Sequence, residues 1–240
     1  DFAEGATDLA VRTGPDSEFQ LDMLGSDGPS LKASGMLTLD VFGFVQLDGS
    51  FAIEQRSQDV VTAEGETVRA DLLTIGGSGI HAFAGVNGGT DDALGLDMSG
   101  VGFAVALVTE QAGVGVTTPR KWTTLQATAE SVGIVGIDDF TLSANDLLIE
   151  VNQAGVVGQP VLDFSSGATA LEVTTGSGPD DKVAFAMDGA DGELLRATGN
   201  LVIDAFGFFQ VDGDFAVEKK SGSVTLATGE EVAVDLLTIG

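Results

Sequence analysis

The strongest constraint on the fold is an internal repeat. Residues 14–76 align without gaps to residues 178–240 at a shift of 164, and 33 of the 63 aligned positions are identical. The Phe-Gly-Phe sequence at 42–44, for example, recurs at 206–208. Because equal sequences fold alike, the chain must build one unit more than once, and repeats of this size are typical of stacked arrays.

A shorter and more diverged repeat divides the chain further. Segments that begin at Gly5, Gly79 and Gly167 start alike, and each is followed by a loop rich in Gly, Pro and Asp. The pattern is A–B–A, which we interpret as a piece of a longer array with a 164-residue A–B period. The predicted modules are residues 1–76, a diverged module at 77–164 with an inserted loop at about 108–122, and a third module at 165–240.

The clearest local pattern lies between residues 36 and 54. Leu37, Leu39 and Val41 alternate with polar or small residues, which is the two-residue period of a half-buried strand. Asp48-Gly49 stands between alternating apolar residues and predicts a tight hairpin turn there. The recurring Phe-Gly-Phe at 42–44 is interpreted as core packing around a glycine bend. Further turns are expected at 63–66 and 228–230.

The middle module also contains patterns that fit helices. Residues 145–151 resemble a capped helix start, and apolar residues between 122 and 132 fit a helical face. Their counterparts in the flanking modules are predicted strands. Since repeated units share a fold, we predict strands in the middle module as well.

Together these patterns predict an all-β protein. Each module is expected to have six or seven short strands, with turns every 8–12 residues. No Pro/Ser-rich linker separates the modules at 74–80 or 161–168, which favours units that share a continuous sheet or core. We therefore expect tandem antiparallel β modules stacked into an elongated, rod-like array, with a β-solenoid as the alternative.

Composition excludes several classes of function. The formal net charge of −27 would repel nucleic acid and anionic membrane surfaces. The longest clean apolar run, at about 101–108, is too short to span a bilayer. The absence of cysteine excludes disulfide scaffolds, thiolate metal sites and a cysteine nucleophile, and His81 is the single histidine. Together with the absence of a phosphate-binding loop or a serine nucleophile elbow, this predicts a non-enzymatic protein without catalytic residues or an organic cofactor.

Two sets of residues are candidates for binding. Asp91 and Asp92, and likewise Asp188 and Asp191, lie in Asp/Gly loops whose oxygens can serve calcium, although the alternative is that these are ordinary turn residues. The second set, Arg120, Lys121 and Trp122, is the chain's only basic and aromatic cluster. It either contacts a partner or belongs to a loop folded onto its own module.

Two stretches carry a resemblance to a known class of protein. They begin Leu-Lys-Ala-Ser-Gly-Met-Leu-Thr-Leu at residue 31 and Leu-Leu-Thr-Ile-Gly-Gly-Ser-Gly at residue 72. Both are similar to the tandem repeats of giant secreted or surface-attached bacterial proteins, which are adhesin-like or form fibres in the matrix. The resemblance implies an extracellular or cell-surface location and a scaffold or adhesion role, and it supplies no catalytic residue.

The expected function follows from the near-identity of the first and third modules. Duplicated cores and turns suit length, stiffness or filament assembly, whereas a catalytic site normally breaks such symmetry. We expect a structural repeat whose partners are copies of itself or adjacent repeats, joined through unpaired strands. The alternative is an adhesin-type module that recognises carbohydrate or a host surface through the middle-module loop, with calcium as a possible ligand.

Overall fold

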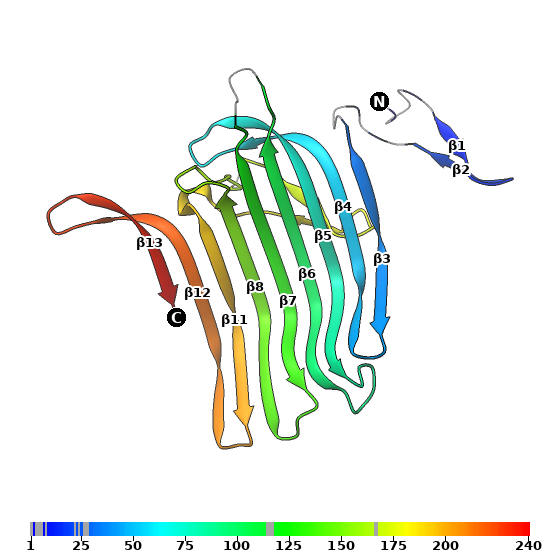
Figure 1. The fold of residues 1–240 in the computed structure, drawn as a ribbon, viewed down its shortest axis with the longest axis vertical. Helices are drawn as coiled ribbons and strands as arrows, with labels where there is room; N and C mark the ends of the chain where they lie inside the picture. Colours follow the sequence, from blue (N-terminus) through cyan, green and yellow to red (C-terminus); the bar gives the residue numbers. More distant parts are fainter. Residues whose placement is uncertain are drawn as a thin grey trace.

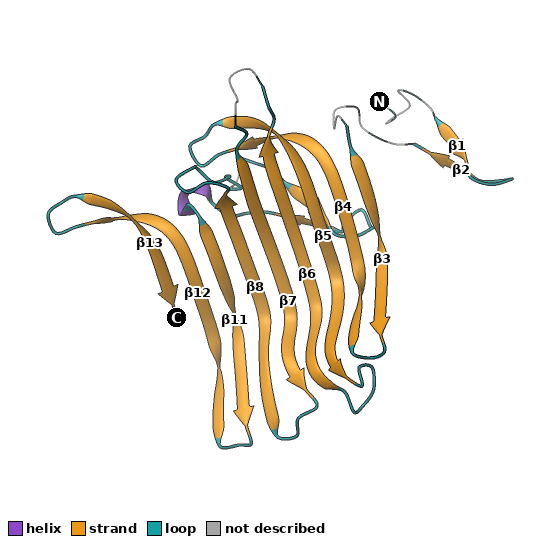
Figure 2. Ribbon diagram, viewed as in Figure 1, coloured by secondary structure: helices purple, strands orange, loops and turns teal. Residues whose placement is uncertain are grey.

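A computed structural model describes residues 2, 7, 9–21, 23, 25, 29–113, 118–165 and 168–240, and these are almost entirely β (Figures 1 and 2). The all-β antiparallel prediction is confirmed. Helical structure in these ranges is limited to short 3₁₀ turns such as η3 (Gly189–Asp191), and no helix formed by these residues is long and apolar enough to cross a membrane.

Nine strands form one open antiparallel sheet in the order β13-β12-β11-β8-β7-β6-β5-β4-β3, so that β3 and β13 are its edges (Figure 1). Neighbours in the sheet are also neighbours in sequence, apart from the step between β8 and β11. The strands are β3 (Leu31–Val41), β4 (Val45–Val61), β5 (Thr67–Val86), β6 (Leu94–Glu110), β7 (Lys121–Val135), β8 (Phe140–Ala154), β11 (Leu194–Ala205), β12 (Phe209–Thr225) and β13 (Glu231–Ile239).

Two small hairpins complete the structure. One pairs β1 (Ala10–Arg12) with β2 (Glu18–Gln20) and lies to the side of the sheet (Figure 1). The other pairs β9 (Glu172–Thr174) with β10 (Lys182–Ala184). It belongs to residues 155–193, which we call the crossing segment because it leaves β8, passes across one face of the sheet and returns to β11 (Figure 1).

The 164-residue repeat is preserved in the strand register. Gly35 pairs with Phe51 in the β3–β4 ladder, and Gly199 pairs with Phe215 in the β11–β12 ladder, at the same shift. The β12–β13 register reproduces the β4–β5 register in the same way. The predicted module boundary after residue 76 falls inside β5, so one continuous strand runs across it.

The hairpin turn predicted at Asp48-Gly49 is wrong, because the chain turns at Phe42-Gly43 instead. Both of these residues have left-handed backbone angles, with φ of 52° and 70°, and the Phe44 N–H closes the turn by donating to the Val41 carbonyl oxygen at 2.9 Å. Residues 42–44 lie between the last paired residues of the ladder, Val41 and Val45. Gly49 pairs with Leu37 in mid-strand and lies at a register shift between β4 and β5. A Cβ atom there would lie 2.6 Å from the Ile80 side chain, so the glycine allows close approach of β5.

The interpretation of the Phe-Gly-Phe sequence as core packing is also wrong. Phe42 is 92% exposed at the tip of the β3–β4 hairpin, and its counterpart Phe206 is exposed at the tip of the β11–β12 hairpin. Asp40 holds this turn by accepting a hydrogen bond from the Gly43 backbone N–H at 2.8 Å. The turns predicted at 63–66 and 228–230 are confirmed, and β7 and β8 confirm strands in the middle module.

The main core lies between the sheet and the crossing segment. Leu72 and Val108 of the sheet are buried against Leu162 and Val173 of the crossing segment, together with Trp122 of β7. One buried polar side chain links the two layers: the Asn152 side chain donates to the Leu162 carbonyl oxygen at 2.7 Å. The sheet face under the crossing segment therefore carries a packed core, while the opposite face has no such layer in the described residues.

Backbone contacts fix the place of the crossing segment on the sheet. The Val61 N–H donates to Thr169 Oγ1 at 2.7 Å, and the Ala63 N–H donates to the Val161 carbonyl oxygen at 2.9 Å. At Gly76 the crossing chain comes so close that an added Cβ would lie 2.3 Å from the Thr174 carbonyl oxygen. A glycine is therefore required where β9 crosses β5.

Candidate functional site

The most unusual surface of the protein is the free edge at β3. All eleven residues of this strand are exposed, and they include the apolar side chains of Leu31, Met36, Leu37 and Leu39. A long edge strand with exposed apolar side chains presents unpaired backbone donors and acceptors to another strand. Natural proteins usually cover or interrupt such an edge, so this one is a candidate interaction surface.

The opposite edge, β13, has the same character. Leu237 and Ile239 are exposed there, while their counterparts Leu73 and Ile75 in β5 are half-buried because β6 lies beside them. The outer side of β13 thus corresponds to the side of β5 that pairs with β6. By the same shift, the outer side of β3 corresponds to the side of β11 that pairs with β8. Both free edges therefore repeat backbone edges that are paired in the middle of the sheet.

An ion-pair cluster shows how a strand is held at the β11 edge. Arg196 of β11 donates to Glu150 of β8 at 3.0 Å and to Glu218 of β12 at 2.7 Å. The pKa of Glu218 is lowered, first by the hydrogen bond from Arg196 and then by the one from Lys220. Lys32 of β3 stands at the position of Arg196, so the β3 edge also carries a cation where the β11 edge receives an acidic strand.

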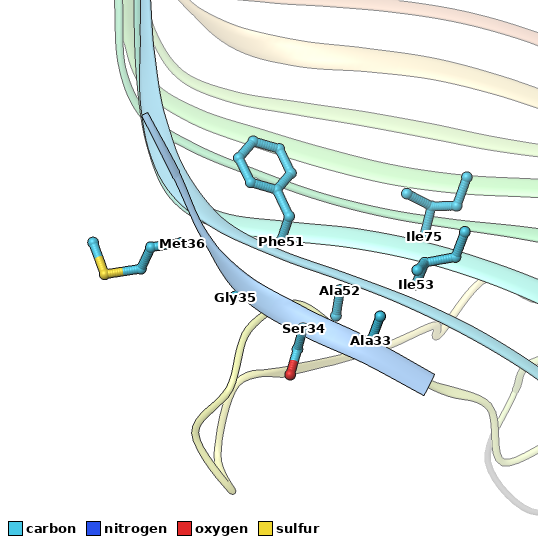
Figure 3. A pocket seen from close by; sticks show the side chains of 8 residues that line it. All are labelled: Ala33, Ser34, Gly35, Met36, Phe51, Ala52, Ile53 and Ile75. Atoms are coloured by element: carbon cyan, nitrogen blue, oxygen red, sulfur yellow. The ribbon is translucent and has the colours of Figure 1, made fainter. Parts of the chain in front are cut away.

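The sheet is curved, and its concave face carries apolar side chains in rows across the strands. In Figure 3, Phe51, Ile53 and Ile75 point into the concave side, opposite to the crossing segment, which lies on the convex side. One such row runs through seven paired strands from β3 to β11. Its members are Ala33, Ile53, Ile75, Val105, Leu125, Val151 and Leu195.

A second row on this face is stabilised by aromatic packing. Phe51 of β4 and Phe103 of β6 have ring centroids 6.3 Å apart on either side of Gly77. A Cβ at Gly77 would lie 2.7 Å from the Phe103 ring, so the glycine gives the two rings their space. Apolar residues on this face thus form a surface, because the crossing segment covers only the other face of the sheet.

One hollow, of about 320 Å³, lies against β3 and β4 (Figure 3). Its lining is apolar except for the hydroxyl of Ser34, and none of its eight residues has a titratable side chain. The lining residues are Ala33, Ser34, Gly35, Met36, Phe51, Ala52, Ile53 and Ile75. This chemistry suits packing of another apolar surface better than acid–base catalysis.

The predicted basic and aromatic cluster is folded onto its own chain. Trp122 is 1% exposed, and its indole N–H donates to the Pro160 carbonyl oxygen at 2.9 Å. Arg120 lies 5.4 Å from the Trp122 ring centroid and pairs with Glu66 at 2.7 Å and with Glu110 at 3.0 Å. These hydrogen bonds from Arg120 lower the pKa of both carboxyl groups.

Arg120 and Trp122 therefore contact other parts of the same chain, including Glu66 of the first predicted module. Lys121, the first residue of β7, is exposed. Partner binding through the three residues stays a prediction, and the inserted loop itself lies partly outside the described residues at 114–117.

The four candidate calcium ligands are placed in two separate turns. Asp91 and Asp92 lie in the exposed turn between β5 and β6. Asp188 caps η3 by accepting a hydrogen bond from the Ala190 N–H at 2.9 Å, and Asp191 pairs with Arg196 and Lys220 at 3.5 and 3.4 Å. Across the parts of the chain that the structure describes, no group of three or more acidic or histidine side chains is placed to hold a metal ion.

The single histidine, His81, is half-exposed. Its Nε2 atom lies 2.8 Å from Asp97, and its Nδ1 atom lies 3.6 Å from Asp48. These contacts join β4, β5 and β6 on one face of the sheet.

Comparison of the chain with family models, with curated proteins and with solved structures finds no match.

Proposed function

We propose that this chain is a non-enzymatic structural repeat of an extracellular bacterial surface or filament protein. In this proposal the sheet gives length and stiffness, and it grows by adding strands at β3 and β13. The partners are copies of the chain or adjacent repeats of the same kind.

The observation that carries the proposal is that the free edge of β3 repeats the edge of β11, which is paired with β8 inside the sheet. The β3–β4–β5 register recurs in β11–β12–β13 at the 164-residue shift, and the β11 copy of the β3 edge is paired with β8. A strand like β8 therefore has a preformed acceptor at β3, with the same backbone spacing and a cation at the same place. Main-chain hydrogen bonds supply affinity in such strand addition, and matching side-chain rows supply register.

The strong negative charge suits such a scaffold. A net charge of −27 keeps separate copies soluble and repels them at long range, so that growth requires close and specific edge contact. Exposed apolar residues then drive association once two edges meet.

The proposal is tested by placing proline in the β3 edge. Successive residues of a strand direct their N–H groups to opposite sides, so one of Leu37→Pro and Thr38→Pro removes a donor on the free side and leaves the β4 ladder intact. The variant that keeps the β4 ladder is the one whose circular dichroism spectrum and melting temperature match those of the wild type. Val157→Pro, in a loop where the valine is exposed, serves as the matched control.

We expect the wild-type chain to form elongated assemblies at high protein concentration, seen by negative-stain microscopy. The folded edge variant should associate roughly tenfold more weakly, because about 1.4 kcal/mol of edge interaction corresponds to that factor. Discrete particles of the wild type at all concentrations, or equal assembly of the folded edge variant and the wild type, would overturn the proposal.

A further inference from the structure

The β1–β2 hairpin is a second copy of the β9–β10 hairpin. Val11 pairs with Phe19 in the first, and Val173 pairs with Val183 in the second, so the two ladders have the same register. The sequences correspond at a shift of 162 before the hairpin turn and 164 after it, because the second turn is two residues longer.

Hydrogen bonds around the two hairpins also correspond. The Phe2 N–H donates to the Met23 carbonyl oxygen at 2.9 Å, as the Phe164 N–H donates to Met187 at 3.0 Å. The Leu21 N–H donates to the Leu9 carbonyl oxygen at 3.0 Å, and the counterpart bond from Phe185 to Leu171 measures 3.2 Å. The N-terminal hairpin is therefore already folded in the conformation of the docked one.

The two hairpins differ in what covers them. Leu171 and Val173 are 1% and 0% exposed because they pack against β4, β5 and β6, whereas their counterparts Leu9 and Val11 are 42% and 45% exposed. Met187 is buried, and its counterpart Met23 is exposed. The N-terminal hairpin thus presents, without a cover, the apolar side chains that form the core elsewhere in the same chain.

The surface that would receive this hairpin is also repeated and also uncovered. Val60, Val68 and Leu72 line the convex face of β4 and β5 and are buried beneath the crossing segment. At the same positions β12 and β13 carry Val224, Val232 and Leu236, which are only half-buried. The receiving side chains are thus of the same type.

One glycine position and one residue pair also support the correspondence between the two hairpins and their receiving surfaces. An added Cβ at Gly76 would lie 2.3 Å from the Thr174 carbonyl oxygen, so the docked hairpin requires a glycine there. The counterpart of Gly76 is Gly240, which is also a glycine although an added Cβ there would meet no atom within 4 Å. Thr174 donates a hydrogen bond to Glu54 at 3.3 Å, and the counterpart pair would be Arg12 and Glu218, whose charges are opposite.

We propose that residues 9–21 and Met23 dock on the convex face of β12 and β13 of a second copy of this chain, as residues 171–187 dock on β4 and β5 within each copy. The inference rests on the proposed function, because a strand added at β13 supplies the counterpart of β6 beneath the hairpin. Each copy then covers the end of its neighbour, and the hairpin acts as a clasp between successive copies.

The place of docking is tested by cross-linking, since the chain contains no cysteine. Arg12→Cys and Glu218→Cys are made in separate chains of different tag length, mixed, and treated with a short thiol–thiol cross-linker. We expect the mixed dimer to form at least tenfold faster than in a mixture of Val157→Cys with Glu218→Cys. Equal rates in the two mixtures would overturn the proposal.

The contribution of the hairpin is tested by Val11→Asp in the full chain. A charge on the docking face should weaken self-association, measured by sedimentation, at least tenfold and leave the melting temperature unchanged, because the hairpin is separate from the sheet core. Val157→Asp makes the same chemical change at a valine that is 91% exposed, and it should leave self-association unchanged. Equal association of the two variants would contradict the clasp.

The two proposals fail in different ways. If Val11→Asp chains assemble like the wild type and the 12–218 cross-link is absent, the clasp is wrong and edge growth stands. If a folded proline variant of β3 assembles like the wild type while the cross-link still forms, edge growth is wrong and the hairpin contact stands.

Discussion

At the scale of single residues, glycines occur where two backbone segments approach too closely for a side chain. Gly76 and Gly240 are counterparts in the repeat, yet an added Cβ would strike the Thr174 carbonyl oxygen at 2.3 Å in the first and meet nothing in the second. We expect Gly76→Ala to lower the free energy of unfolding by about 1–3 kcal/mol, the usual cost of overpacking. Denaturant titration followed by circular dichroism measures this.

Gly240→Ala is the matched control, and in dilute protein it should change the unfolding free energy by less than about 0.5 kcal/mol. An equal loss in both variants would mean that the close approach of Thr174 to Gly76 does not limit stability. The sequence alone identified both positions as repeated, but the contact joins residues about a hundred positions apart and leaves no local signal.

At the scale of elements, the turns at 63–66 and 228–230 could be predicted from the sequence, but the turn of the β3–β4 hairpin could not. Asp48-Gly49 has the composition of a hairpin turn, but Phe42-Gly43 makes the turn because Asp40 binds the Gly43 N–H and both turn residues adopt left-handed angles. Strands β7 and β8 were predictable because the repeat outweighed their helix-like spacing. Local pattern therefore predicted that these residues form strands, but the expected short strands with turns every 8–12 residues are wrong, because β4, β5 and β6 run for 17, 20 and 17 residues. The choice between the two turn sequences depends on the side chain of Asp40, which caps the Phe42-Gly43 turn.

The candidate surfaces were predictable only in part. The sequence predicted that unpaired strands would join copies, and β3 and β13 lie at the edges where this can occur. The sequence did not predict that one face of the sheet lacks a covering layer. Alternation of apolar and polar residues distinguishes the two faces of a strand but does not show which face is covered. The cover comes from the crossing segment, whose hydrogen bonds to β4, such as Val61 to Thr169, join distant residues.

The packing of the crossing segment onto the sheet depends on the single tryptophan. Trp122→Ala should lower the free energy of unfolding by about 3–5 kcal/mol, because a large buried ring and its hydrogen bond to Pro160 are lost together. Guanidinium denaturation followed by far-UV circular dichroism measures the change. Phe42→Ala, which removes an exposed aromatic side chain, should cost less than about 0.5 kcal/mol. Similar costs for the two variants would contradict the assignment of Trp122 to the core.

At the scale of the whole molecule, two opposing forces would act on the proposed assembly. Uncovered apolar residues on the edges, the concave face and the N-terminal hairpin favour association, and the net charge of −27 opposes it. Charge repulsion acts over a Debye length of about 30 Å at 0.01 M salt but only about 4–5 Å at 0.5 M. Apolar contacts are not weakened by sodium chloride in this range, so salt should shift the balance toward assembly.

We therefore expect the self-association constant to rise at least tenfold between 0.01 and 0.5 M sodium chloride, measured by sedimentation at pH 7. Lowering the pH toward the isoelectric point of about 4.1 should act in the same direction, because protonation of carboxylates removes the repulsion.

Calcium chloride at matched ionic strength, with and without chelator, separates charge screening from specific calcium binding. A larger increase of the association constant with calcium chloride than with sodium chloride would support the Asp-rich turns as calcium ligands. Association that weakens with salt would mean that ion pairs between copies, rather than apolar edges, hold the assembly together.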